Sequence, residues 1–135
     1  MKIEIGQTLP ELVKEISQAS INRYAEATGD FNPIHVDEAF ARKTPFKGTI
    51  AHGFYILGFL SELMTRQFGK AWVEGGSLDV RFKRPVKPGD TIIVKATLID
   101  RKLIKGLPCL EFDAVWENHR HEPVIIGKAF VRETV

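Results

Sequence analysis

The chain has 135 residues, of which 44% are hydrophobic and 27% are charged, a balance that is ordinary for one globular domain. Its 19 Lys and Arg residues are offset by 17 Asp and Glu residues, so the net charge of +2 gives no support for nucleic-acid binding. The one cysteine, Cys109, excludes an intrachain disulfide and suits a reducing compartment. The first residues contain no apolar signal core, and we therefore expect a cytoplasmic protein with a single domain over residues 1–135.

The first part of the chain is expected to be mainly helical. A short strand is predicted for residues 12–16, and a helix for residues 20–28, where apolar side chains recur at helical spacing. Gly29 is expected to end this helix, since glycine adopts the left-handed backbone geometry of a helix end without strain. A second, short helix is expected for residues 38–43, with Asp37 as its N-cap.

The longest apolar run of the chain extends from Ala51 to about Phe68 and is rich in Leu, Met and Phe. Such a run is too long for one strand and predicts a helix that other structure encloses. The run is shorter than a membrane-spanning helix needs to be and contains His52 and Glu62, so we expect no membrane segment. Its later turns carry a polar stripe that could border a cavity or a partner, namely Ser61, Glu62, Thr65 and Arg66.

The second half of the chain alternates apolar and polar residues with a period of two, which is typical of half-buried strands. Turn residues separate the stretches 78–82, 92–98, 110–116 and 124–131. Helices first and regularly spaced strands afterwards predict an α+β domain with an antiparallel sheet. A curved sheet wrapped around the one apolar helix would accommodate both halves.

Asp30 and His35 are the candidate catalytic pair, because both lie on the segment that connects the first two predicted helices. Pro33 lies between them; proline fixes its own φ and favours an extended backbone at Asn32, so this connection is expected to be stiff. A carboxylate beside an imidazole can hold a water molecule and exchange protons with it near neutral pH. In the alternative interpretation, Asp30 and Asn32 only satisfy the helix end and the turn, and His35 lies on the surface.

The start of the predicted buried helix is the second candidate site. Backbone N–H groups near Gly53 would have no partner within the helix, and the helix dipole would reinforce their attraction for a developing oxyanion. Glycine would also let a ligand approach the backbone closely, although Gly53 could equally serve tight packing. Ser61 could hydrogen-bond in the same cavity, or bond back to its own preceding turn.

Other polar features give weaker signals. His119 and His121 lie two residues apart with no cysteine nearby, so no metal site is expected there. No phosphate-binding or dinucleotide-binding glycine motif occurs, and we expect no bound cofactor. A series of basic side chains could meet an anionic cofactor, although solvated strand faces are the usual explanation: Arg81, Lys83, Arg84, Lys87, Arg101, Lys102 and Lys105.

The segment 24–37, which reads YAEATGDFNPIHVD, resembles the signature of the MaoC-like, (R)-specific enoyl-CoA hydratases. The stretch 51–53, AHG, and the stretch 85–90, PVKPGD, are similar to the same family at the expected places. The resemblance extends over nearly the whole chain. It implies a hot-dog fold, in which an antiparallel sheet wraps around the long helix, usually as a homodimer or a larger assembly. The chain departs from the commoner hydratase pattern at residues 54–58, where Met often follows the His-Gly pair.

The resemblance also implies roles for single residues. Asp30 and His35 match the catalytic dyad of the family, and Gly53 matches the residue whose backbone amide contacts the thioester oxygen. Ser61 matches a serine found beside the dyad in some members. Asn32 is a further candidate for binding the substrate. The implied reaction is the reversible, (R)-specific hydration of a trans-2-enoyl thioester of coenzyme A or acyl carrier protein, with neither a metal nor another cofactor.

Two alternative functions stay open at this point. A hot-dog thioesterase would use a carboxylate on the long helix, here Glu62, to activate water against the thioester carbon. A non-catalytic domain would bind an acyl thioester for regulation or within a multisubunit complex, without turnover.

Overall fold

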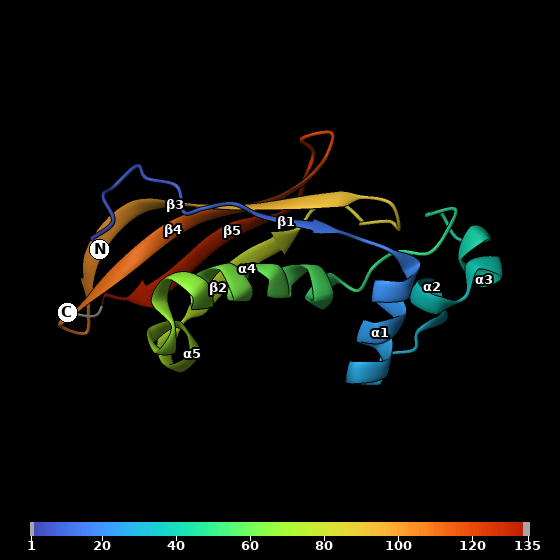
Figure 1. Ribbon diagram of the computed structural model, residues 1–135, viewed down its shortest axis with the longest axis horizontal. Coiled ribbons are helices and arrows are strands. Elements are labelled where there is room, and N and C mark those ends of the chain that lie inside the picture. Colours follow the sequence, from blue (N-terminus) through green and yellow to red (C-terminus); the bar gives the residue numbers. More distant parts are fainter. Residues whose placement is uncertain (1, 134–135) are drawn as a thin grey trace.

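The computed structural model describes residues 2–133, which form one antiparallel sheet with the longest helix against one of its faces and three short helices beyond one end (Figure 1). The strands are β1 (Leu12–Glu15), β2 (Ser77–Phe82), β3 (Thr91–Ile104), β4 (Leu107–Asn118) and β5 (Pro123–Arg132). The helices are α1 (Gln18–Thr28), α2 (Pro33–Val36), α3 (Glu38–Arg42), α4 (Gly53–Phe68) and α5 (Lys70–Gly75). The predicted α+β hot-dog arrangement, a sheet wrapped around one long helix, is confirmed.

Helix α4 lies at the centre of the core because its apolar side chains are buried against the sheet. Ile56 and Leu60 are almost completely buried, and the indole N–H of Trp116 in β4 donates to the backbone oxygen of Ile56 over 2.9 Å. Phe68, at the end of the helix, packs edge-on against Phe112 of the same strand. Each such buried side chain contributes about 1.5–3 kcal/mol to folding. These contacts fix α4 so that its N-terminal end points toward α1, α2 and α3 (Figure 1).

The ends of the first helix follow from its caps. Helix α1 begins at Gln18, earlier than predicted, because Ser17 and Ser20 form a reciprocal cap in which each hydroxyl accepts the other residue's backbone N–H. Gly29 ends the helix with φ 79°, as predicted. The predicted N-cap of α3 is also confirmed, since the Asp37 carboxylate accepts the N–H of Phe40.

Two short helices and part of one strand were not predicted. Helices α2 and α5 have 4 and 6 residues, too few for a clear apolar period. Strand β3 runs on past Leu98 through an irregularity in its pairing with β4. The break predicted at residues 106–108 is displaced: Lys105 and Gly106 form the turn with positive φ, and Pro108 already pairs with Leu103.

The strand order β1-β3-β4-β5-β2 leaves β1 and β2 at the two edges of the sheet. Leu12 of β1 lies opposite Val94, and Ser77 of β2 lies opposite Phe130. Within residues 2–133, no helix combines the length and the apolar character needed to cross a membrane.

Candidate active site

The segment between α1 and α2 is organised by Asp30, whose carboxylate accepts the backbone N–H of Asn32 over 3.2 Å. Asn32 has the extended backbone expected before Pro33, with φ −52° and ψ 128°, and its side-chain oxygen caps α2 by accepting the N–H of Ile34. Pro33 is the first residue of α2, where its fixed φ suits a helix. This single helical turn brings His35 back toward Asp30, with ligand atoms of the two side chains within 4.8 Å.

His35 is held from two sides. Its backbone oxygen accepts the side-chain N–H of Gln18 over 2.8 Å, and Gln18 in turn accepts the hydroxyl of Thr49. Its ring Nδ1 lies 2.8 Å from the backbone oxygen of Ile50. Because a carbonyl oxygen only accepts hydrogen bonds, Nδ1 carries a proton, and in the neutral imidazole Nε2 therefore keeps a free lone pair. His35 is thus prepared to accept a hydrogen bond at Nε2.

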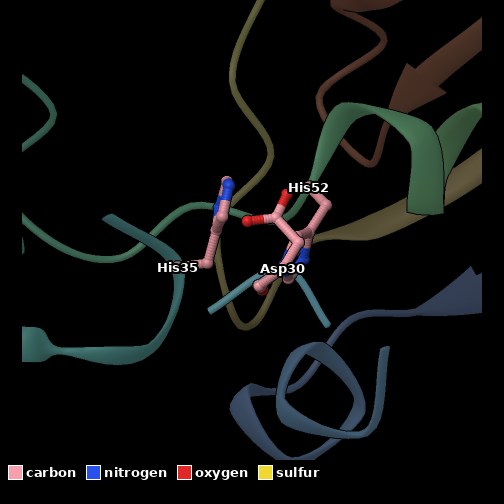
Figure 2. A group of neighbouring side chains, drawn as sticks. All are labelled: Asp30, His35 and His52. Carbon is pink, nitrogen blue, oxygen red and sulfur yellow. The ribbon is translucent and has the colours of Figure 1, made fainter. Parts of the chain in front are cut away.

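His52 is a third member of the site that the sequence analysis did not select. Its buried ring stacks on the ring of His35, with centroids 3.9 Å apart and planes tilted by 27°. Its Nε2–H donates to the backbone oxygen of Asp30 over 2.9 Å. Figure 2 shows the three side chains grouped next to the first turn of α4, with the Asp30 carboxylate directed toward the His35 ring. The sequence offers one signal for a role of His52, namely its position directly before Gly53.

Asp30, His35 and His52 are of the types that bind divalent metals, and their ligand atoms lie within 4.8 Å of one another. The lone pair of an imidazole lies in the ring plane, so a bound metal must lie in that plane at about 2.0–2.1 Å from the nitrogen. The centroids of the two stacked rings lie 3.9 Å apart and the ring planes are tilted by 27°, so the rings lie face to face and their edges do not converge on one point. A carboxylate beside an imidazole can also exchange protons with a water molecule.

Gly53 places a backbone N–H beside the dyad. As the first residue of α4, it has no partner for this N–H inside the helix, and the helix dipole adds positive potential there. The residue is exposed, and it lines both of the cavities that adjoin the dyad. The arrangement can stabilise a negative charge that develops on a carbonyl oxygen.

Two cavities meet at His35 and Gly53. One has a volume of about 350 Å³ and is mainly apolar, with Phe46, Ile50, Ile56, Val86 and Ile125 among its lining residues. We call it the apolar cavity. The other has a volume of about 550 Å³, and we call it the dyad cavity; its lining includes Tyr24, Asp30, His52 and Phe54. Phe82 lines both cavities. Because this residue is 53% exposed, it does not close either cavity off from solvent.

Ser61 is not brought together with these groups in the single chain. Its hydroxyl accepts the indole N–H of Trp72 in α5 over 2.8 Å, and it lines neither the apolar cavity nor the dyad cavity. Asn32 lies next to Asp30, but its side-chain oxygen is used as the cap of α2. Glu62, the candidate carboxylate of a thioesterase, pairs with Lys14 at 2.9 Å and Arg66 at 2.7 Å.

The chain is similar in sequence and in structure to proteins that are already known. The family profile described as MaoC like domain matches residues 3–113. The 3-hydroxybutyryl-CoA dehydratase of Methylorubrum extorquens is 39% identical over 110 residues, which make up 79% of this chain and 69% of that protein. The (R)-specific enoyl-CoA hydratase of Rhodospirillum rubrum is 35% identical over 96 residues, or 71% of this chain and 66% of that protein. The solved structure of the (R)-hydratase from A. caviae has a TM-score of 0.83 and 28% identity, with 98% of both chains covered.

Proposed function

This chain belongs to the MaoC-like domain family, and from that premise we propose that it hydrates trans-2-enoyl thioesters reversibly to (R)-3-hydroxyacyl thioesters. The observation that carries the proposal is the meeting of the Asp30 carboxylate, the Nε2 of His35 and the Gly53 amide at the junction of two cavities. The names of the relatives, hydratase and dehydratase, support a hydro-lyase. The reaction needs no cofactor beyond the carrier of the acyl group.

The residues that line the two cavities support one arrangement of the substrate. The acyl chain enters the apolar cavity, where burial of each CH₂ group favours binding by about 0.8 kcal/mol. The thioester oxygen lies at the N-terminal end of α4, where the N–H of Gly53 stabilises the enolate oxygen that forms in the transition state. The β carbon then faces the dyad cavity.

A water molecule in the dyad cavity donates one hydrogen bond to the Asp30 carboxylate and the other to Nε2 of His35. Its oxygen forms a bond to the β carbon while Asp30 takes the proton. The electron pair of the double bond moves onto the enolate, and the α carbon then receives a proton from Asp30. Water and proton add on the same face, and the carboxylate is restored. Dehydration is the reverse of these steps.

Basic side chains near the apolar cavity suit the phosphate groups of a thioester carrier. Lys83 and Arg84 line the cavity, and both are exposed. The ammonium group of Lys87 donates to the backbone oxygen of Phe46, which lines the same cavity. Positive charge at the cavity mouth attracts a carrier that bears phosphate, which holds for coenzyme A and for the prosthetic arm of acyl carrier protein.

A homodimer or larger homo-oligomer is part of the proposal. Phe54 and Phe82 are 69% and 53% exposed beside the site, their rings stack with centroids 6.3 Å apart, and β2 is an edge strand of the sheet. Exposed apolar groups next to a free strand edge are typical of an interface, and a second copy would shield the site from bulk water. The lone, buried Cys109 supports the proposed location in the reducing cytoplasm.

The decisive experiment incubates the protein with trans-2-butenoyl-CoA and follows two signals together. Hydration removes the absorbance of the conjugated double bond, releases no free thiol and gives a product of R configuration. Release of thiol without loss of the double bond would instead identify a thioesterase, which the ion pairs of Glu62 do not favour. Saturable binding without either signal, over a series of chain lengths, would identify a non-catalytic binding domain.

A further inference from the structure

His52 lies in the middle of the candidate site, with only 3% of its surface exposed. Its ring lies between the rings of Tyr24 and His35, at centroid distances of 4.7 Å and 3.9 Å. The ring of Tyr24 also stacks on that of Tyr55, with centroids 5.3 Å apart. These four rings are in continuous contact and connect α1, α2 and α4.

The hydrogen bonds of His52 show why an imidazole is used here. Its Nε2 donates to the backbone oxygen of Asp30 over 2.9 Å, which fixes the tautomer with the proton on Nε2. Its Nδ1 is buried and has no hydrogen-bond partner among residues 2–133. A buried polar atom without a partner costs free energy, and a phenylalanine of similar shape would avoid that cost. The N–H that reaches Asp30 is the feature that phenylalanine would lack.

The backbone of His52 also forms part of the first peptide unit of α4. Its carbonyl oxygen accepts the N–H of Tyr55 over 3.1 Å, the first hydrogen bond of the helix. This carbonyl and the N–H of Gly53 belong to the same planar peptide group, so their directions are fixed relative to each other. His52 therefore contacts the backbone of Asp30 and the ring of His35, and its own carbonyl belongs to the peptide group that carries the Gly53 amide.

We infer that His52 is a positioning residue that holds Asp30, His35 and the Gly53 amide in the relative arrangement that the reaction needs. The catalytic consequence of this inference rests on the proposed function, whereas the geometry itself does not. His52 does not line the apolar cavity, so it has no part in holding the acyl chain. Its loss should therefore lower kcat and leave KM almost unchanged.

Three variants separate the two contacts of the His52 side chain. In His52→Ala both the ring contact and the N–H are lost, and a displacement of the dyad by about 1 Å should lower kcat by roughly 10- to 100-fold. In His52→Phe the ring contact is kept and the N–H is lost. In His52→Gln the side-chain amide can supply an N–H to the Asp30 oxygen without a ring. The variant Leu63→Ala, buried on α4 and away from the site, controls for a general loss of stability.

We expect kcat to be highest for the wild type, lower for His52→Gln, and lowest for His52→Phe and His52→Ala, which should be similar. KM should be nearly the same for all four proteins. The control Leu63→Ala should retain the wild-type kcat at a temperature where it is folded. The inference is overturned if His52→Phe matches the wild type, or if His52→Gln is no better than His52→Ala. It is also overturned if the variants lose kcat only in proportion to their loss of folded protein.

A measurement on the resting protein tests the geometry without any turnover. Nitrogen-15 NMR of the imidazoles should show His52 with its proton on Nε2 and His35 with its proton on Nδ1. The opposite tautomer of His52 would overturn the inference even for a fully active enzyme. Absence of activity toward enoyl thioesters in the wild type, with both tautomers as expected, would instead remove the proposed function and leave the positioning geometry intact.

Discussion

A Cβ atom on Gly53 would lie 2.9 Å from the Cε1 atom of Phe82, closer than such contacts normally allow. Gly53 is the first residue of α4, and Phe82 is the last residue of β2. The absence of a side chain at this helix end therefore lets the aromatic ring approach the backbone amide that we assign to the thioester oxygen. The first turn of α4, the edge strand β2 and the proposed oxyanion site therefore meet at this contact.

The variant Gly53→Ala should lower kcat/KM by roughly 10- to 100-fold, because the displaced Phe82 ring or the displaced helix end misplaces the substrate. Stability should change little, because Phe82 is 53% exposed and its ring can move. Steady-state kinetics and a thermal unfolding curve measure both effects.

The double variant Gly53→Ala/Phe82→Leu provides the matched control. Shortening the aromatic side chain removes the clash, so activity should return toward that of Phe82→Leu alone. A double variant no better than Gly53→Ala would show that the added methyl group acts on the substrate directly.

The variant Asp30→Asn should lower kcat by about two to four orders of magnitude if Asp30 transfers the proton. The fold of the segment should persist, since an asparagine side-chain oxygen can still accept the N–H of Asn32. Hydration of trans-2-butenoyl-CoA measures the loss. The control is Asp37→Asn, which makes the same change at the N-cap of α3 and should keep wild-type turnover. Near-normal activity of Asp30→Asn would remove Asp30 from the reaction.

The variant Phe46→Ala should alter the preference for acyl-chain length. Phe46 forms a half-exposed wall of the apolar cavity, so its truncation should cost little stability. Each CH₂ group of the substrate that loses this contact should bind about 0.8 kcal/mol more weakly, which is roughly fourfold. A series of enoyl-CoA chain lengths should therefore show a loss of kcat/KM that grows with chain length. An equal loss for all chain lengths would place the acyl group elsewhere.

The variant Phe54→Asp should weaken self-association. Phe54 is 69% exposed on the first turn of α4, so the isolated chain loses little when the ring is removed. A charge in an apolar interface costs far more than one in water. Sedimentation equilibrium of wild type and variant measures the masses. The exposed Val73 of α5 offers a control, Val73→Asp, which should leave the assembly unchanged if the interface is at the site.

Stability should depend on pH through Glu111. Hydrogen bonds from Lys102 and Lys128 lower the pKa of this carboxyl below its ordinary value of 4.5. At pH values between the lowered pKa and the ordinary one, Glu111 is protonated in the unfolded chain and ionised in the folded chain. The stabilisation from Glu111 is therefore complete above pH 4.5 and lost as the pH falls through the lowered pKa.

The measurement for Glu111 compares the melting temperatures of wild type and Glu111→Gln from pH 7 to pH 3. The wild type should be the more stable at pH 7, and the difference should shrink toward pH 3. The variant Glu26→Gln, at an exposed position of α1, should show no such convergence. A constant difference for Glu111→Gln over the whole range would exclude the ion pairs as its cause.

Local signals predicted part of the dyad segment. The glycine that ends α1 and the stiff, extended connection at Asn32 and Pro33 were expected, and each acts on its immediate neighbours. The helical turn of α2, which brings His35 back toward Asp30, was not predicted. The start of α4 beside this segment was predicted from one apolar run.

Tertiary contacts determined what the sequence could not show. The burial of His52 depends on Tyr24 and His35, which belong to other helices. No periodic pattern in the sequence therefore predicts this burial. The hydroxyl of Ser61 is engaged by Trp72, which lies in the unpredicted helix α5. A polar residue on a long helix has several possible neighbours, and the sequence does not say which of them will be within reach.

The pairing of the edge strands has a consequence for the order in which the protein can form during synthesis. Within the described residues 2–133, strand β1 pairs only with β3, as in Leu12 opposite Val94, and β2 pairs only with β5, as in Ser77 opposite Phe130. Such distant pairings slow folding, because a long loop must close before they stabilise anything. The segment with Asp30 and His35 leaves the ribosome early, whereas Ile125 of β5, which lines the apolar cavity next to His35, is synthesised near the end. The sheet can therefore be completed only after β5, its last strand in the sequence, has been synthesised.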